Sequence, residues 1–218
     1  MKQLVIIGAR GFGREIYNSA CESIGYESEY IIKGFLDDKK DALDGKDGYP
    51  PILSSVEDYQ IEKNDVFVCA LGDVRFKEKY TNMILEKGGE FFTLIHNSAY
   101  ISKNVKYGKG CLFLAGVRIQ CDSTIGNYVT FQPYCVIGHD VTIGDWTIIN
   151  AFADCGGASK IGNRVTLNTT CFVIPKGIVE DGATVGAGSV TMRKVKAGTT
   201  VFGVPAKPIV IPQAKQSE

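Results

Sequence analysis

The sequence predicts a small α/β domain of Rossmann type followed by a parallel β-helix. In the first part of the chain, short apolar runs alternate with amphipathic helical patterns, which is typical of a parallel sheet covered by helices. From Ile101 to Val185, an apolar residue then recurs at every sixth position without a slip. Neither an α-helix nor an ordinary strand has that period, so this stretch is expected to be a solenoid of stacked short strands.

The first part of the chain contains four apolar runs and two helical patterns. Strands are expected at residues 2–7, 30–36, 66–71 and 91–95. The first helix carries Ile16, Tyr17, Ala20 and Ile24 on one face, and the second, from about 75 to 87, carries Tyr80, Ile84 and Leu85. The Lys and Glu side chains of the second helix are expected to face solvent.

The six-residue repeat assigns a position to each side chain of the second part. Its fifteen apolar anchors should point into a narrow core, and the residue four positions later is small or β-branched and should pack beside them. We expect a strand of about four residues and a two-residue turn per repeat, with three repeats closing one coil. The glycine that often follows an anchor is expected to serve the turn. Coils should stack about 4.8 Å apart, as paired strands do.

An ordinary β-sandwich with accidental spacing is the alternative. Fifteen apolar matches in one frame make accidental spacing a poor explanation. The predicted domains are therefore an α/β domain at 1–96, a β-helix at 97–207 and a C-terminal tail at 208–218.

Composition and charge exclude several classes of partner. The chain has 24 basic and 24 acidic residues and no clustered basic stretch, so a nucleic-acid partner is not expected. No run of eighteen apolar residues exists, which argues against a membrane span. The apolar run at the N-terminus is too short for a signal peptide, so we expect a cytoplasmic protein.

The seven cysteines are expected to be packing residues in a reducing compartment. Cys111, Cys135 and Cys171 occupy the small inward position of the repeat, and Cys155 is an anchor. No cysteine or histidine spacing suggests zinc, and no metal is expected.

A glycine motif stands between the first predicted strand and helix. Gly8, Gly11 and Gly13 there would let a phosphate approach the backbone at a helix N-terminus. Asp37 and Asp38, at the end of the second strand, are placed to accept hydrogen bonds from a ribose or a base. A tight turn without a ligand is the alternative. One such half-domain is too small for NAD, so a nucleotide or sugar nucleotide fits better.

His139 is the candidate general base. It stands two positions after the anchor Ile137, so it should point outward, and the adjacent Asp140 can fix the tautomer of its ring. Gly157 follows eighteen positions later and should lie above His139, where its N–H is a candidate oxyanion donor. The other histidine, His96, is expected to have a structural role.

The repeat, together with Gly138–Asp140, Val185–Val190 and Gly203–Lys207, resembles the hexapeptide-repeat acyltransferases. The N-terminal glycine motif with Asp37 and Asp38 narrows the resemblance to sugar acetyltransferases related to sialic acid O-acetyltransferase and to the bacillosamine-type UDP-4-amino-sugar N-acetyltransferases. The resemblance implies left-handed coils, a homotrimer with active sites between subunits, and acetyl-CoA as the co-substrate.

The resemblance also implies roles for individual residues. His139 matches the general base and Asp140 its acidic partner. The positions that match the acetyl-CoA site are Gly157, Thr169, Ala187, Ile148 and Lys207. Those that match the nucleotide-sugar site are Gly8, Arg10, Gly11, Gly13, Asp37, Asp38 and Gln132. Four positions depart from common family residues, namely Arg10, Phe12, Gln132 and Ile148, where some relatives have a small residue, histidine, asparagine and a second histidine.

The leading hypothesis is N-acetylation of a nucleotide-linked amino sugar, with His139 as base and direct attack on the thioester. O-acetylation of sialic acid or a related sugar is the alternative within the enzymes. A non-catalytic β-helix that binds a nucleotide sugar or scaffolds partners is the alternative of another class, and an NAD oxidoreductase fits least. Basic side chains near the late coils are candidates for the CoA phosphates: Lys176, Arg193, Lys194 and Lys196.

Overall fold

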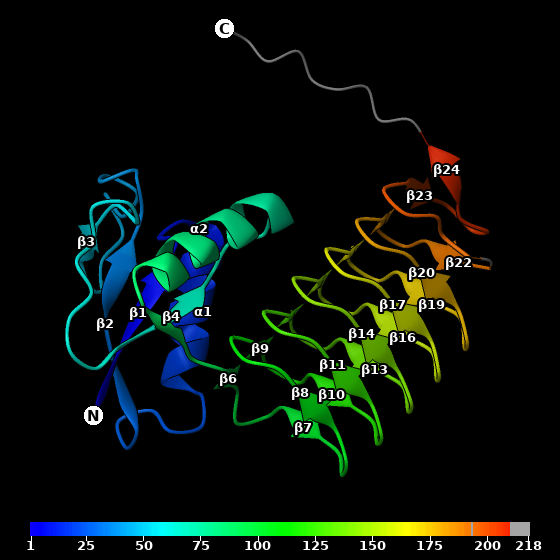
Figure 1. Ribbon diagram of the computed structural model, residues 1–218, viewed down its shortest axis with the longest axis horizontal. Coiled ribbons are helices and arrows are strands. Elements are labelled where there is room, and N and C mark those ends of the chain that lie inside the picture. The colour runs from blue at the N-terminus through cyan, green and yellow to red at the C-terminus, as the bar shows by residue number, and fades with distance from the viewer. Residues whose placement is uncertain (193, 210–218) are drawn as a thin grey trace, which may run out of the picture.

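The computed structural model describes residues 1–192 and 194–209 (Figure 1). Arg193 and the predicted tail from residue 210 onward lie outside the described residues. Within the described part, an α/β layer at the N-terminus leads into a long solenoid of short strands.

The N-terminal part is a parallel sheet with the strand order β3-β2-β1-β4-β5. Its strands are β1 Lys2–Ile7, β2 Tyr30–Leu36, β3 Ile52–Ser54, β4 Asp65–Cys69 and β5 Glu90–Phe91, and its helices are α1 Gly11–Cys21 and α2 Val74–Glu86. The predicted Rossmann-like arrangement is confirmed. The sequence did not indicate β3, which has only three residues and follows two prolines. Asp73 begins α2 by accepting a hydrogen bond from the Arg75 N–H at 2.8 Å.

The prediction of one strand at residues 91–95 is wrong, because this segment contains parts of two strands, β5 and β6. β5 pairs with β4, whereas β6 (Leu94–Ile95) pairs with β9 (Leu112–Phe113) in the solenoid. Between them, the Phe92 N–H still bonds to the sheet at Phe67, and the Leu94 N–H already bonds to Cys111. The apolar run therefore serves two sheets, and the chain enters the solenoid without a linker.

The solenoid is a left-handed parallel β-helix with three sheets. The β6 sheet adds β9, β12 (Thr130–Phe131), β15 (Ile148–Ile149), β18 (Thr166–Leu167), β21 (Thr184–Val185), β23 (Thr200–Phe202) and the antiparallel β24 (Lys207–Ile209). The β7 sheet contains β7 (Tyr100–Ile101), β10 (Arg118–Ile119), β13 (Val136–Ile137), β16 (Asp154–Cys155), β19 (Phe172–Val173) and β22 (Val190–Thr191). The β8 sheet contains β8 (Lys106–Tyr107), β11 (Thr124–Ile125), β14 (Thr142–Ile143), β17 (Lys160–Ile161) and β20 (Ile178–Val179).

Within the stack, each short solenoid strand pairs with the strands eighteen residues before and after it. Most of these strands have two residues rather than the predicted four. The ladder nevertheless extends past the strand, because the N–H groups of Lys106 and Gly108 both bond to the next coil. The predicted repeat of strand and two-residue turn is therefore correct in outline.

The core of the β-helix consists of the predicted anchors and their small neighbours. Cys111, Cys135, Cys155 and Cys171 are all buried in it, and all seven cysteines of the chain are free thiols. Two anchors of the first coil are less buried: Ile101 is partly buried, and Tyr107 is 44% exposed because no coil lies beneath its β8 side.

The glycines after the anchors have a different role from the predicted one. The left-handed backbone conformation falls two residues later, at positions such as Asp122, Asp140 and Ala158. A Cβ on Gly126 would instead lie 2.2 Å from Asp145 Oδ1, in the turn of the next coil. These glycines are thus required by the close stacking of coils and not by the turn itself.

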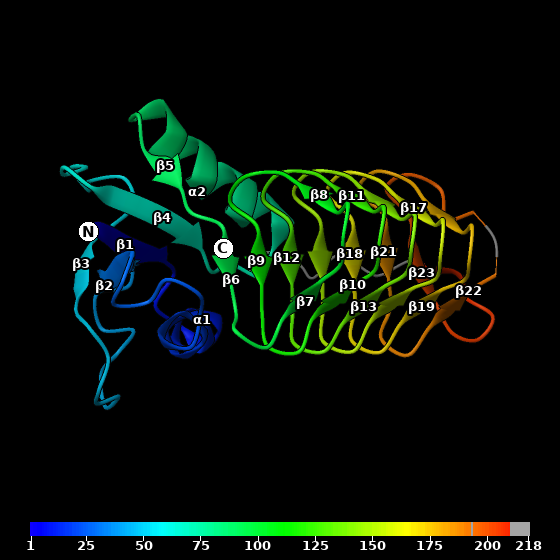
Figure 2. The same cartoon turned by 90° about the horizontal axis from the view of Figure 1, so that it is seen from below.

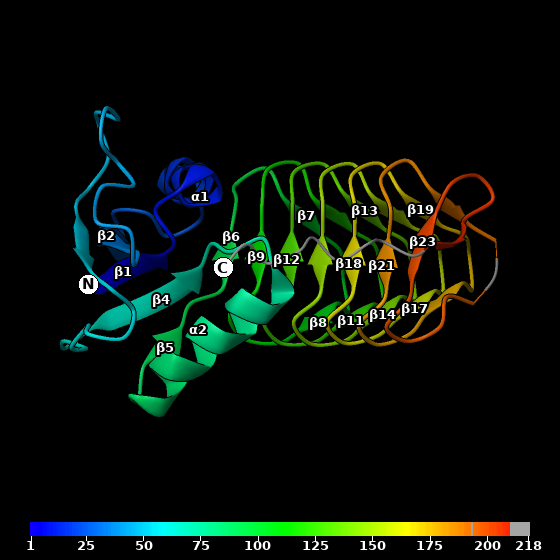
Figure 3. The same cartoon turned by 90° about the horizontal axis from the view of Figure 1, so that it is seen from above.

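The α/β part and the β-helix share apolar contacts and buried polar contacts. Leu112 and Leu114 pack into the N-terminal core. The Tyr128 ring stacks on the Trp146 ring, with 4.3 Å between the ring centroids, and the Phe91 ring contacts Tyr128 edge-on. Helix α2 lies alongside β12 (Figures 2 and 3), and the Lys77 ammonium on it donates to the Thr130 hydroxyl at 2.6 Å and to the Tyr128 carbonyl. The expectation that every lysine of this helix faces solvent is therefore wrong.

None of the helices within 1–192 and 194–209 is both long and apolar enough to cross a membrane.

Candidate functional site

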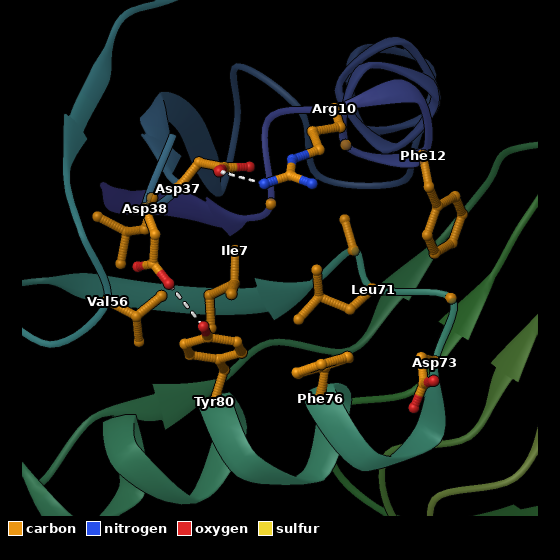
Figure 4. A pocket seen from close by; sticks show the side chains of 15 residues that line it. Ile7, Arg10, Phe12, Asp37, Asp38, Val56, Leu71, Asp73, Phe76 and Tyr80 are labelled. Carbon is orange, nitrogen blue, oxygen red and sulfur yellow. Dashed lines mark hydrogen bonds and ion pairs between the residues drawn. The ribbon is translucent and has the colours of Figure 1, made fainter. Parts of the chain in front are cut away.

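A cavity of about 360 Å³ lies at the carboxyl ends of β1, β2 and β4 (Figure 4). Such a position is where ligands bind in open parallel sheets. Its floor is apolar, with Ile7, Val56 and Leu71, and its rim carries charged and aromatic groups from the turn after β1 and from α2. The predicted Gly8, Arg10, Gly13, Asp37 and Asp38 all line it.

The two aspartates of the cavity differ in what they bond. Asp37 is buried, and its carboxylate accepts the backbone N–H groups of Ala9 and Lys39, each at 2.9 Å. Arg10 is a further neighbour, 3.7 Å from Asp37 Oδ1. Asp37 therefore holds the glycine turn against the end of β2.

Asp38 has one oxygen in use and one free of hydrogen bonds to the described residues. The Tyr80 hydroxyl donates to Asp38 Oδ2 at 2.6 Å (Figure 4). That bond raises the pKa of Tyr80 to about 12, since a phenolate beside the carboxylate would lose the donor and be repelled; burial adds to the shift. Of the two aspartates, Asp38 is the one free to accept a hydrogen bond from a ligand.

The three glycines of the motif also separate by geometry. Gly8 has a φ of +97°, and a Cβ on Gly13 would lie 2.0 Å from the Gly8 carbonyl oxygen, so both are needed to close the turn. A Cβ on Gly11 would meet nothing within 4 Å. Gly11 stands at the first position of α1, whose N-terminus has no side-chain cap. The open backbone here is the part of the motif that can receive a phosphate.

Aromatic side chains frame the cavity. Phe12 lies at one edge and Phe76, which is 52% exposed, at another (Figure 4). The helical pattern of the sequence did not indicate Phe76 as a site residue, and it predicted that Tyr80 faces a core. The spacing in α2 could have indicated both residues, because Phe76 and Tyr80 are four positions apart and lie on the same face of the helix.

His139 and Asp140 form the second candidate site, in the turn between β13 and β14. Their side chains are 65% and 61% exposed, and His139 Nδ1 lies 2.7 Å from Asp140 Oδ2. With Nδ1 donating to the carboxylate, the neutral ring keeps the lone pair of Nε2 free. That is the arrangement required of a general base.

Gly157 lies against the His139 ring, as the eighteen-residue spacing predicts. A Cβ on Gly157 would be 2.6 Å from His139 Nε2. Within the described chain, the Gly157 N–H has no hydrogen-bond acceptor, although the neighbouring Ala158 N–H bonds to the His139 carbonyl at 2.8 Å. A glycine with an unpaired N–H thus adjoins the imidazole ring.

The remaining predicted residues lie elsewhere on the β-helix. Thr169 and Ala187 stand at the turns between the β6 and β7 sheets, whereas His139 and Gly157 stand at the turns between the β7 and β8 sheets. Gln132 follows β12 near the first of these corners. Ile148 is only 1% exposed and offers almost no surface to a ligand, and Lys207 is exposed in β24. One chain therefore does not bring the whole predicted acetyl-CoA set together.

The basic residues proposed for CoA phosphates are only partly available. The Lys176 N–H bonds to the Gly157 carbonyl at 2.9 Å, which places this lysine one coil above Gly157 and two coils above His139. Lys194 is paired with Glu180 at 2.5 Å, and Lys196 is exposed.

His96 has the expected structural role. It is buried, with Nδ1 2.8 Å from the Ser98 hydroxyl and Nε2 3.0 Å from Glu22. In the part of the chain that the structure describes, no cluster of three metal-ligating side chains occurs.

Two family models match the chain. Residues 3–84 match the PglD N-terminal domain, and residues 122–153 match the bacterial transferase hexapeptide repeats. GDP-perosamine N-acetyltransferase of Escherichia coli is 27% identical over 212 residues, which cover 93% of this chain and 94% of that protein. UDP-N-acetylbacillosamine N-acetyltransferase of Bacillus subtilis is 30% identical over 117 residues, 53% of this chain and 52% of that protein.

Two solved structures have the same fold over nearly the whole chain. The acetyltransferase domain of PglB from Neisseria gonorrhoeae has a TM-score of 0.85 at 25% identity, covering 96% of this chain and 100% of that chain. PerB from Caulobacter crescentus, solved in complex with CoA and GDP-perosamine, has a TM-score of 0.85 at 26% identity, covering 96% and 98%.

Proposed function

Because the chain belongs to the hexapeptide-repeat sugar acetyltransferases with a PglD N-terminal domain, we propose that it transfers the acetyl group of acetyl-CoA to the amino group of a nucleotide-linked amino sugar. The N-terminal cavity supports binding of the nucleotide: the free oxygen of Asp38 would accept from the nucleoside, and the open backbone at Gly11, between the lining residues Arg10 and Phe12, would receive a phosphate. N-acetylation is favoured over O-acetylation because both sugar-modifying relatives named above are N-acetyltransferases.

The observation that supports the mechanism best is that the free Nε2 of His139 faces the Cα of Gly157, a residue whose own N–H bonds to no described residue. In the proposed reaction, the sugar nitrogen attacks the thioester carbonyl and gives up a proton to His139 Nε2. The C–N bond forms, the Gly157 N–H donates to the oxyanion, and the C–S bond then breaks. His139 returns the proton to the departing CoA thiolate. Asp140 holds the ring and stabilises its protonated form.

His139→Ala tests this mechanism. Loss of a general base removes about 10²–10⁴-fold of the rate, so turnover should fall by that factor while acetyl-CoA binding is retained. Steady-state kinetics with a nucleotide amino sugar and calorimetry with acetyl-CoA measure the two quantities. Near-full turnover in His139→Ala with bound acetyl-CoA would sink the assignment of the base.

The assembly that we propose is a homotrimer with active sites between chains. In one triangular coil, the β6 sheet beside the cavity lies opposite the corner that carries His139. A nucleotide sugar held by one chain would therefore meet the His139 corner of a second copy. Light scattering of the purified protein should give three times the mass of one chain.

We further propose that the α/β domain ends near residue 96, where His96 follows β6, and that the β-helix extends to about residue 207. Cytoplasmic location is also a proposal, and the seven free thiols support it because a reducing compartment keeps cysteines unpaired.

A further inference from the structure

A single column of side chains runs along the outer face of the β6 sheet, and its character changes from one coil to the next. The column consists of the residues that directly follow the anchors: Leu114, Gln132, Asn150 and Asn168. Leu114 is 2% exposed and belongs to the core of the α/β domain. The three residues above it are partly exposed amides. The column is therefore apolar where the α/β domain covers it and polar immediately beyond.

The polar part of this column begins one coil beyond an apolar core that also contacts the N-terminal cavity. Phe12 lines the cavity and packs against the same core as Leu114. Gln132 is the next residue of the column, one coil step of about 4.8 Å away. Helix α2 marks the same border from its own side, since Phe76 and Tyr80 line the cavity while Lys77 bonds to Thr130. In Figure 4, Phe12 and Asp73 lie at the side of the cavity nearest the green strands of the β-helix.

The amides are oriented and only partly satisfied. Asn168 Nδ2 donates to the Val185 carbonyl at 3.0 Å, and Asn150 Nδ2 donates weakly to Asn168 Oδ1 at 3.4 Å. These bonds fix which way both amides point and leave the Asn150 oxygen without a donor among the described residues. The Gln132 amide makes no hydrogen bond to any described residue. Each amide can both donate and accept, which matches a sugar hydroxyl.

We propose that Gln132, Asn150 and Asn168 form the surface that reads the sugar ring of the acceptor, while the nucleotide occupies the N-terminal cavity. Only the position of Gln132 was indicated by the family resemblance; Asn150 and Asn168 enter through the coil stacking. Two coil steps span about 10 Å, comparable to a six-membered sugar ring with its hydroxyl groups. The inference rests on the proposed function and names its specificity-determining residues.

The test separates binding of the sugar from binding of the nucleotide. Calorimetry compares the wild type with Asn150→Ala and Asn168→Ala, using GDP, UDP, GDP-perosamine and a UDP-linked 4-amino sugar as ligands. Both variants should bind the preferred free nucleotide with an affinity within about twofold of wild type. They should bind the amino sugar linked to that nucleotide about tenfold more weakly, since each variant loses one or two hydrogen bonds to the sugar ring. KM for acetyl-CoA should not change in Asn150→Ala, whereas Asn168 adjoins Thr169 of the predicted acetyl-CoA site.

A second readout is the selectivity among sugars. A site built to bond a hydroxyl rejects an analogue that lacks it, so wild type should discriminate against a deoxy analogue and Asn150→Ala should lose that discrimination. Gln60→Ala is the matched control, because Gln60 is an exposed amide in a loop of the α/β domain. It should behave as wild type in every measurement.

The outcomes distinguish this inference from the proposed function. If both variants bind the nucleotide sugar as tightly as wild type, or lose free nucleotide equally, the inference is overturned and the function stands. If wild type binds a nucleotide sugar through this column but transfers no acetyl group, the function is overturned and the inference stands. A wild type that binds neither nucleotide sugar overturns both.

Discussion

Gly157 illustrates how a single residue can be constrained by the side chain it faces. A Cβ at this position would lie 2.6 Å from His139 Nε2 and 2.9 Å from Cε1, closer than real contacts allow. Its backbone is not in the left-handed region, so alanine is compatible with the turn itself. A side chain at position 157 would therefore clash with the imidazole, whereas the backbone of the turn would accept one.

Gly157→Ala should leave the fold intact and damage activity. The added methyl must displace the ring from its bond with Asp140 or occupy the space beside Nε2, and misplacement of about 1 Å can cost on the order of 10² in rate. The melting temperature serves as the control and should stay close to that of wild type. Normal turnover by a folded Gly157→Ala protein would show that the reaction does not take place at Nε2.

At the scale of structural elements, one corner of the β-helix is held by a ladder that the apolar frame did not indicate. The N–H of each turn donates to an Asn or Asp side chain one coil further on: Lys109 to Asn127 at 3.1 Å, Asn127 to Asp145 at 2.7 Å, Asp145 to Asn163 at 2.8 Å, and Asn163 to Asp181 at 2.8 Å. The side chains supply acceptors for turn N–H groups that lie outside the strand ladders. An Asn or Asp at every eighteenth residue is the sequence signal for it.

Asp145→Ala should destabilise the β-helix measurably. It leaves the Asn127 N–H without its charged acceptor, and hydrogen bonds to charged groups contribute about 1.5–3 kcal/mol. Thermal melting should show a drop of several degrees for a chain of this size. Thr142→Ala, on the exposed face of β14, is the control and should change stability little. Equal melting temperatures for the two variants would contradict the role of the ladder.

On the scale of the whole molecule, Lys77 and Glu78 fasten the α/β part to the β-helix. Glu78 pairs with Arg164, with 2.7 Å between Arg164 Nε and the carboxylate. Lys77 is buried between the two parts, and burial lowers its pKa to about 8 despite the nearby thiols of Cys69 and Cys111. The contact is therefore sensitive to protonation.

Comparison of wild type with Lys77→Met over pH tests this contact. Between pH 8 and the ordinary lysine pKa of 10.5, the unfolded chain holds a proton at Lys77 that the folded chain has released. Stability from this group therefore rises with pH across that window and is smallest below it. Urea unfolding with reductant present measures the free energy of unfolding of both proteins at pH 7.5 and 9.5. Relative to Lys77→Met, the wild type should be more stable at pH 9.5 than at pH 7.5. A constant difference would show that Lys77 does not titrate in the interface.

The six-residue period predicted most of the β-helix, because the period identifies which residues are buried. It predicted the β-helix core, the four cysteines within that core and the stacking of Gly157 on His139. It failed where one apolar run serves two sheets, at residues 91–95, since pattern alone cannot assign a partner. It also failed at Lys77, because a buried ammonium needs acceptors that come from the distant Tyr128 and Thr130.

The sequence by itself determined the repeat, the α/β order and the outward His139–Asp140 pair, since all of these follow from spacing along one chain. Only the tertiary structure decided that Asp37 fixes a turn while Asp38 faces the cavity, and that the amide column starts where the core of the α/β part ends. The physical reason is that hydrogen-bond partners and cavity walls come from residues far apart in the sequence. Their meeting depends on packing, which no local pattern encodes.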